Sequence, residues 1–214
     1  MAKIKRFSRA SSLFFISLGE HFAKFKWCYI ILGAISLSAV VVGFITGFKQ
    51  ADNMTLVDIP DVTLVKFVEK EITAFSVFFS RIFSVLGLFL LVWISNCKPW
   101  LSVITFILLI YRAFLLGITC SMLIVLYKMG GIINVVLIFF PFHLLVLFAL
   151  MGWCAVCLQT NLSCKTTGIS VLNYEFWRYN KSCLFGFLIL VLLSYLMEAI
   201  LIPYITSAVF IGIS

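Results

Sequence analysis

The sequence predicts an all-α polytopic membrane protein, and three observations support this fold class. Hydrophobic residues make up 64% of the 214 residues and charged residues only 11%, which is more apolar surface than one soluble core can bury. Five apolar runs reach the roughly 20 residues that one helical crossing of the hydrocarbon core requires. Basic residues gather in alternate segments between these runs, as they do on the cytoplasmic side of membrane proteins.

Residues 1–26 precede the first apolar run and are predicted to form an amphipathic helix on the inner leaflet. Apolar side chains recur there at helical spacing among basic ones: Leu13, Phe14, Leu18, Phe22 and Phe25. His21 in this segment is interpreted as an ordinary interfacial histidine rather than a pH sensor. The first apolar run is too long for a cleaved signal peptide, so we expect the N-terminus to be retained.

Residues 27–208 are predicted to form a single membrane domain with five spans. The spans lie at about 27–48, 75–95, 100–127, 132–158 and 183–205. The inner segments carry ten basic and two acidic residues, whereas the outer segments, with Arg81 counted among them, carry five of each. The positive-inside rule therefore predicts a multi-pass protein of the cell membrane with a cytoplasmic N-terminus and an external C-terminus. The net charge of +8 is then explained by topology and by attraction to anionic lipids, so no nucleic acid partner is predicted.

An external amphipathic helix is predicted between the first two spans. Its apolar side chains are spaced alternately by three and four residues: Val65, Val68, Ile72, Phe75 and Phe79. The helix runs into the second span without a break. Its apolar face is expected either to lie on the membrane surface or within the chain, or to dock on another protein.

Arg112 stands near the middle of the third span, where an arginine costs about 2.5–3.5 kcal/mol on insertion scales. The intramembrane carboxylate is that of Glu198, in the fifth span. The two residues differ in predicted depth by about three residues, or ~4.5 Å, which two long side chains can bridge. We therefore predict an Arg112–Glu198 pair, which either fixes helix packing or forms part of a transport or proton path.

Other marked positions lie in the fourth and fifth spans. Pro141 is expected to kink its helix and His143 to hydrogen-bond across helices, and Pro203 lies near the end of the fifth span. Cys154 and Cys157 form a single CxxC pair with no acidic or histidine ligand nearby in sequence, so we interpret them as packing residues. No nucleophile and base pair can be placed, so the sequence predicts no enzyme, no metal site and no cofactor.

Several stretches, taken in order, resemble the stage II sporulation protein M family of integral membrane proteins over roughly residues 24–208. They are "VVVGFITGF", "IFSVLGLFLLVWIS", "LLIYRAFLLGITCSMLIVLYKMGG", "IFFPFHLL" and "SYLMEAILIP". By this resemblance Arg112, Pro141, Glu198 and Pro203 match positions that the family marks. Many relatives carry His-Gly and a later carboxylate after the proline, where this chain has Phe142 and His143.

The resemblance implies a noncatalytic scaffold that gathers peptidoglycan hydrolases at the septal membrane during engulfment. In the family these partners are a lytic transglycosylase and an enzyme with amidase and endopeptidase activity. The alternative from the residues themselves is a transporter or permease subunit, because midplane charges and broken helices are what transport sites require. In that case the third span would be two half-helices that meet at Tyr111 and Arg112.

Overall fold

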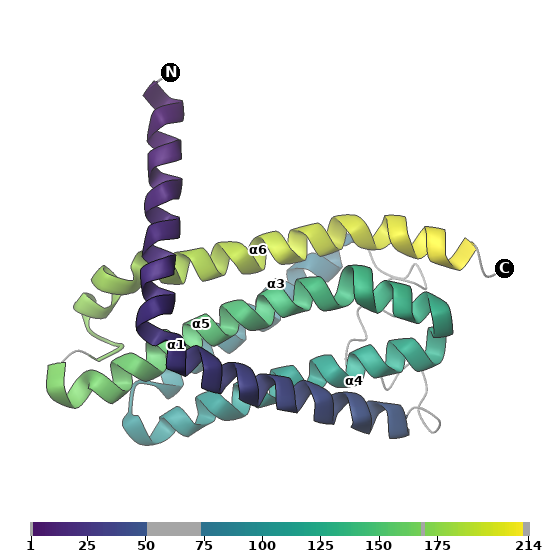
Figure 1. Cartoon of the computed structure of the whole chain (residues 1–214), viewed down its shortest axis with the longest axis horizontal. Coiled ribbons are helices and arrows are strands. Elements are labelled where there is room, and N and C mark those ends of the chain that lie inside the picture. Colours follow the sequence, from purple (N-terminus) through teal and green to yellow (C-terminus); the bar gives the residue numbers. More distant parts are fainter. Residues whose placement is uncertain (1, 51–73, 168–169, 212–214) are drawn as a thin grey trace.

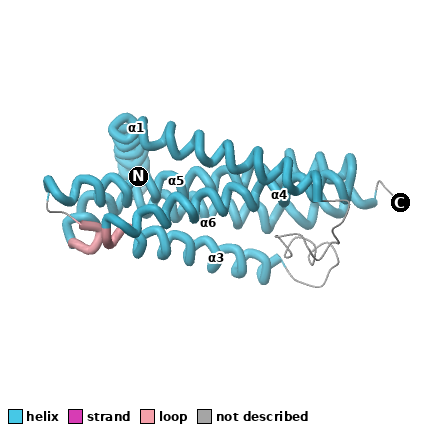
Figure 2. Tube along the Cα trace, turned by 90° about the horizontal axis from the view of Figure 1, so that it is seen from below, coloured by secondary structure: helices cyan, strands magenta, loops and turns pink. Residues whose placement is uncertain are grey.

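The computed structural model describes residues 2–50, 74–167 and 170–211, and every regular element in these ranges is a helix. Within them, five helices are long and apolar enough to cross a membrane. The five segments are Phe25–Gln50, Phe78–Ser95, Trp100–Val125, Phe140–Cys164 and Tyr174–Leu201. They lie side by side along the long axis of the molecule (Figures 1 and 2). The prediction of an all-α polytopic membrane protein is confirmed.

Helix α1 (Ala2–Gln50) contains both the N-terminal segment and the first span. Its backbone leaves the helical region at Phe25, with φ −109° and ψ 18°, and there the helix bends. The part before the bend stands across the long axis of the bundle, whereas the part after it runs along that axis (Figure 1). This direction is the one that a helix lying on a membrane surface would take beside spanning helices.

Helix α3 (Ala74–Ser95) is joined to α4 (Val103–Asn134) by a short turn and a 3₁₀ helix, η3 (Pro99–Ser102). Polar side chains fasten this connection: Thr105 Oγ1 lies 2.8 Å from Ser95 Oγ and 2.7 Å from Asn96 Nδ2. All three residues are buried. The adjoining ends of α3 and α4 are therefore held together by side-chain hydrogen bonds as well as by the turn.

The chain reverses sharply after the third span, at Lys128, whose φ of 49° lies in the left-handed region. Gly131 follows, and a Cβ at this position would overlap the backbone carbonyl of Leu123. The missing side chain lets the returning helix lie directly on the outgoing one. The polypeptide then passes through a π-helix, η4 (Val135–Phe139), into α5 (Phe140–Thr167).

Helix α5 is the central helix of the bundle. In its spanning window 67% of residues are buried, compared with 22% for the span of α1. Helix α6 (Tyr174–Ile211) packs along it, and the ring of Phe187 covers Gly152, where a side chain would clash with it. Helix α6 thus begins at Tyr174, before the predicted start of the fifth span at Cys183, and the polar segment before Cys183 is largely helical.

Helices α1 and α4 approach each other most closely at three glycines. A Cβ on Gly43 or Gly117 would overlap the backbone of the facing helix, at Phe114 and Val40 respectively, and one on Gly47 would overlap Ser121. Gly43 and Gly47 form a GxxxG pair, which is typical of membrane helices whose backbones touch.

Candidate functional site

A cluster of charged and polar side chains lies in the interior of the bundle, between α3, α4, α5 and α6. Its central ion pair joins Arg81 of α3 to Glu198 of α6, with Nη2 3.4 Å from Oε1. Arg81 is 7% exposed and Glu198 is 1% exposed. Arg81 lies 14 residues before the end of its span at Ser95, or about 21 Å along the helix, so the pair lies in the half of the bundle away from Ser95.

His143 of α5 completes the central group. Its Nε2 lies 2.7 Å from Nη1 of Arg81, and its Nδ1 lies 3.0 Å from the carbonyl oxygen of Phe139. The ring stacks on that of Phe139, with the centroids 3.9 Å apart. Nδ1 is also 4.0 Å from Oε1 of Glu198. Three helices therefore meet at one arginine, one histidine and one carboxylate.

Arg112 of α4 contacts the same group of side chains through Tyr195. Its Nη2 donates to the hydroxyl of Tyr195, on α6, over 3.0 Å. Tyr195 is 1% exposed, its ring centroid lies 6.0 Å from the Arg81 guanidinium, and it meets the His143 ring edge to face at 6.1 Å. Tyr195 thus contacts both guanidinium groups: its hydroxyl accepts from Arg112, and its aromatic ring lies near Arg81.

The predicted pairing of Arg112 with Glu198 is corrected by this geometry. The structure places Glu198 Oε1 3.4 Å from Arg81 and 4.0 Å from His143, whereas Arg112 contacts the fifth span through Tyr195, one turn earlier. The depth argument placed Arg112 and Glu198 near the same level but could not reveal which side of each helix faced which neighbour. Arg81 had been counted with the external charges, although it is buried in the bundle.

A signal for Arg81 was present in the sequence. Arg81 belongs to the same helical stripe as Val85, Phe89 and Val92, at spacings of four, four and three. These three side chains are buried, at 1%, 2% and 0% exposure. An arginine on the core-facing stripe of a spanning helix points into the bundle, and this periodicity could have identified it.

The backbone beside His143 departs from regular α-helix. Pro141 has no N–H and cannot donate to the carbonyl of Leu137, and the π-helix Val135–Phe139 directly precedes this region. Side chains hydrogen-bond to backbone carbonyl oxygens in this region. His143 binds the carbonyl oxygen of Phe139, and the hydroxyl of Ser194, on α6, donates to the carbonyl oxygen of Phe142 over 2.7 Å. The proline region is thus a widened, side-chain-supported section at the start of α5.

The remaining predicted positions fall elsewhere. Pro203 lies within α6, but its side chain is outside the described residues, as are all of Val65, Val68 and Ile72. Phe75 and Phe79 lie in the first turns of α3, where they are 71% and 40% exposed and their ring centroids are 4.5 Å apart. These two aromatic side chains therefore lie exposed on the surface of the bundle.

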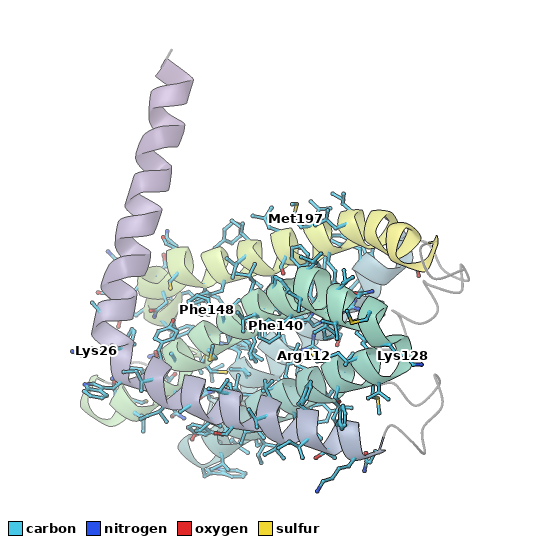
Figure 3. The ribbon with its side chains drawn as sticks, turned by 45° about the vertical axis from the view of Figure 1, so that its right-hand side comes forward. Lys26, Arg112, Lys128, Phe140, Phe148 and Met197 are labelled. Atoms are coloured by element: carbon cyan, nitrogen blue, oxygen red, sulfur yellow. The ribbon has the colours of Figure 1, made fainter. Side chains whose placement is uncertain are left out.

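Helix α4 passes Arg112 without interruption. The backbone departs from helical geometry within α4 only at Lys128, at the far end of the span. Figure 3 shows Arg112 between the two ends of the bundle, which are marked by Lys26 and Lys128. The two half-helices expected for a transporter at Tyr111 and Arg112 are absent from this part of the chain.

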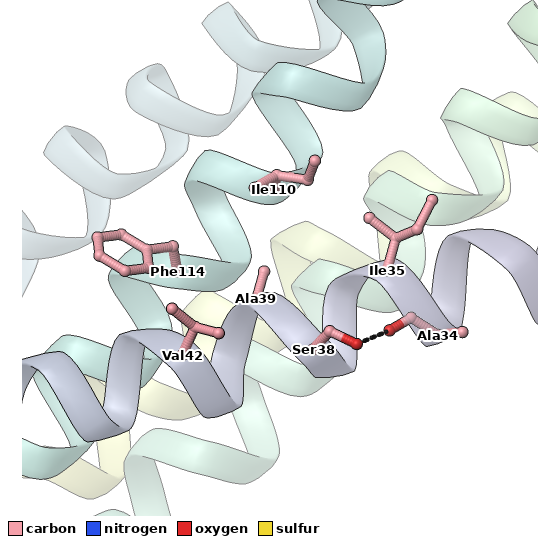
Figure 4. Close-up of a pocket in the computed structure, with 7 residues that line it drawn as sticks. All are labelled: Ala34, Ile35, Ser38, Ala39, Val42, Ile110 and Phe114. Atoms are coloured by element: carbon pink, nitrogen blue, oxygen red, sulfur yellow. Dashed lines mark hydrogen bonds between the residues drawn. The ribbon is translucent and has the colours of Figure 1, made fainter.

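A groove between α1 and α4 is apolar. Its lining residues are Ala34, Ile35, Ser38, Ala39, Val42, Ile110 and Phe114 (Figure 4). The hydroxyl of Ser38 donates to the carbonyl of Ala34, in its own helix, over 2.9 Å. The groove therefore presents a hydrocarbon surface, suited to lipid or to another apolar helix and not to a polar solute.

Cys154 and Cys157 are both buried in α5, and all seven cysteines are free thiols. Across the described ranges, no three His, Cys, Asp or Glu side chains come together in a way that could hold a metal ion. Cys154 is fully enclosed among apolar neighbours of the core.

Comparisons with protein-family models, with curated proteins and with solved structures gave no match. The fold and the site therefore define the class: a polytopic α-helical membrane protein with a charged cluster in its interior. The likeness to the stage II sporulation protein M family stays a prediction from the sequence.

Proposed function

We propose that this chain is a noncatalytic scaffold of the cell membrane that anchors peptidoglycan-remodelling enzymes at the septal membrane, as in sporulation and engulfment. The observation that carries the proposal is the engagement of the interior polar groups with one another. Arg81, His143 and Glu198 join α3, α5 and α6, and Arg112 joins α4 to the same group through Tyr195. Such cross-links fix the relative positions of four helices, which a docking platform requires.

The arrangement of His143 supports a noncatalytic role. Both of its ring nitrogens are occupied, one by the Arg81 guanidinium and the other by the Phe139 carbonyl. A general base must instead hold a lone pair toward a nucleophile or a water. The nearest charged groups are guanidinium groups and a carboxylate, and this set provides packing contacts without a nucleophile.

The proposed orientation places the N-terminus in the cytoplasm and the C-terminus outside. Lys26, Lys98, Arg178 and Lys181 are all exposed. They belong to the start of the first span, the connection between α3 and α4 and the first turns of α6, and these segments lie at the same end of the bundle (Figure 1). Lys49 and Lys128 are the exposed basic residues described at the opposite end. The more basic end is the cytoplasmic one by the positive-inside rule. Phe75 and Phe79 then lie near the outer surface, where cell-wall enzymes work.

A site-specific photocrosslinker in place of Phe79 tests the proposal in intact cells. Peptidoglycan hydrolases should be captured from this position, and their identity follows from mass spectrometry of the crosslinked bands. The matched control carries the same crosslinker at Ile133, which is 42% exposed and lies near the same end of the bundle. Capture of hydrolases to the same extent from both positions, or from neither, would contradict the proposed docking surface.

The second candidate function is a transporter or permease subunit. It is favoured by the presence of two arginines, a histidine and a glutamate within the membrane interior, where ionisable side chains often mark ion or substrate paths. Reconstituted protein would then carry solute across proteoliposomes, and Arg112→Gln would abolish the flux without unfolding the bundle. A scaffold gives no flux and retains its hydrolases during purification.

A further inference from the structure

The contacts of His143 determine where its protons are. An arginine guanidinium only donates hydrogen bonds, so the short 2.7 Å contact with Arg81 Nη1 requires a lone pair on His143 Nε2. The single ring proton must then be on Nδ1, where it points to the carbonyl oxygen of Phe139 at 3.0 Å. The geometry therefore corresponds to neutral histidine in its Nδ1–H form.

The charges that face this ring come from three other helices. Arg81 lies on α3, Arg112 on α4, and Glu198, together with the hydroxyl of Tyr195, on α6. Oε1 of Glu198 is 3.4 Å from Arg81 Nη2 and 4.0 Å from His143 Nδ1. One carboxylate oxygen of Glu198 thus lies within reach of both Arg81 and His143. A second proton on the His143 ring would shift this carboxylate from Arg81 toward His143.

We propose that His143 is a proton-binding site inside the membrane bundle, and that its protonation exchanges the Arg81–His143 contact for a His143–Glu198 ion pair. A proton taken from water forms an N–H bond at Nε2 and removes the lone pair that accepts from Arg81. Two positive groups then face each other at hydrogen-bond distance, and this contact is repulsive where the surroundings are poorly solvated. Glu198 can bind the imidazolium with a small movement, and Arg81 is released from α5.

The surrounding backbone suits such a change. The ring is carried by the section of α5 that follows a π-helix and contains Pro141, where regular helical hydrogen bonds are already interrupted. At the inner end, α3 stays attached to α4 through Ser95, Asn96 and Thr105. Protonation therefore loosens the outer half of α3, around Arg81, and leaves its inner end in place.

Nitrogen-15 NMR of the ring provides the decisive test, because the chain has only two histidines. The His21→Gln variant of the full chain, in lipid nanodiscs and with ¹⁵N-labelled histidine, reports on His143 alone. At neutral pH, Nδ1 should be protonated and Nε2 should not; on acidification from about pH 8 to about pH 4, Nε2 should also become protonated. A proton on Nε2 at neutral pH, or a ring unchanged over this range, would overturn the proposal.

Hydrogen exchange of the α3 amides tests the structural consequence. In the wild-type chain, after correction for the intrinsic pH dependence of amide exchange, acidification should lower the protection factors near Arg81 and leave those around Ser95 unchanged. In Arg81→Gln, protonated His143 no longer faces a guanidinium group. The pH response of the α3 amides should therefore disappear, while the NMR titration of His143 persists. An equal pH response in wild type and in Arg81→Gln would show that the repulsion between Arg81 and protonated His143 does not drive the change.

Discussion

The interface between α1 and α4 and the interface between α3, α5 and α6 hold membrane helices together by different means. The first has glycines at its contact points, with backbone directly against backbone at Gly43 and Gly117. The second is built around a buried arginine, histidine and glutamate. Figure 2 shows α1 and α3 at opposite edges of the bundle, so the two interfaces stabilise separate sides of one molecule.

The difference reflects what a bilayer offers to a folding helix. Apolar side chains gain little by leaving lipid for protein, since both surroundings are hydrocarbon, and association must come from close packing or from polar contacts. The glycine interface uses dispersion at short range, and the residues that close backbone contact brings together there, Gly43, Gly47, Gly117 and Ser121, carry no titratable side chain. The charged interface depends on proton positions and charge balance, and we expect it alone to respond to pH.

The largest effect is expected from breaking the central ion pair. Glu198→Gln leaves the Arg81 charge buried, and we expect a loss of about 3–5 kcal/mol in the free energy of unfolding, measured by denaturation in mixed micelles. Arg81→Gln combined with Glu198→Gln should lose less than the sum of the single changes, by about 0.5–3 kcal/mol. A larger coupling of Glu198 with Arg112 than with Arg81 would reverse the assignment of partners.

A somewhat smaller loss in the free energy of unfolding is expected when Tyr195, whose hydroxyl accepts a hydrogen bond from Arg112, is changed. Tyr195→Phe removes a hydrogen bond to a charged group and should lower stability by about 1.5–3 kcal/mol. Tyr111 is the matched control, because it is next to Arg112 in sequence but 56% exposed, and Tyr111→Phe should change stability by less than about 0.5 kcal/mol. Equal losses in the two variants would show that the Tyr195 hydroxyl is not a specific partner.

The glycine interface is tested by adding one methyl group to α1. Gly43→Ala forces a Cβ onto the backbone of Phe114 and should cost about 1–3 kcal/mol in the same unfolding assay. Gly33 lies on the same helix, and nothing lies within 4 Å of the place that its Cβ would take, so Gly33→Ala should be neutral or stabilising by up to about 1 kcal/mol. Similar behaviour of both variants would argue against close contact of α1 with α4.

The smallest effect is expected at the CxxC pair. Cys154→Ala removes one buried sulfur from α5 and should cost about 0.5–1.5 kcal/mol, as other small deletions in a core do. Zinc or a chelator should not change the melting temperature of the wild-type chain. A clear shift with zinc that is lost in Cys154→Ala would assign a metal to this site.

The sequence could predict which segments cross the membrane, because hydropathy acts on each helix separately. The predicted first span at residues 27–48 and third span at 100–127 lie close to the apolar helical segments Phe25–Gln50 and Trp100–Val125. Helix α6 begins at Tyr174, within the polar segment 159–182, so this helix is longer than the apolar run that starts at Cys183. Charge content alone does not end a helix when aromatic side chains such as Phe176 are buried against the bundle.

The partners within the interior could not be predicted in the same way. Sequence position gives the depth of a residue, at 1.5 Å per residue, but the rotation of each helix about its axis depends on all of its neighbours. Depth alone therefore matched Arg112 with Glu198. The tertiary structure instead turned Arg81 toward Glu198 and His143 and directed Arg112 to Tyr195. The sequence determined that this chain is a bundle of membrane-spanning helices, and only the packing of those helices decided which charges meet.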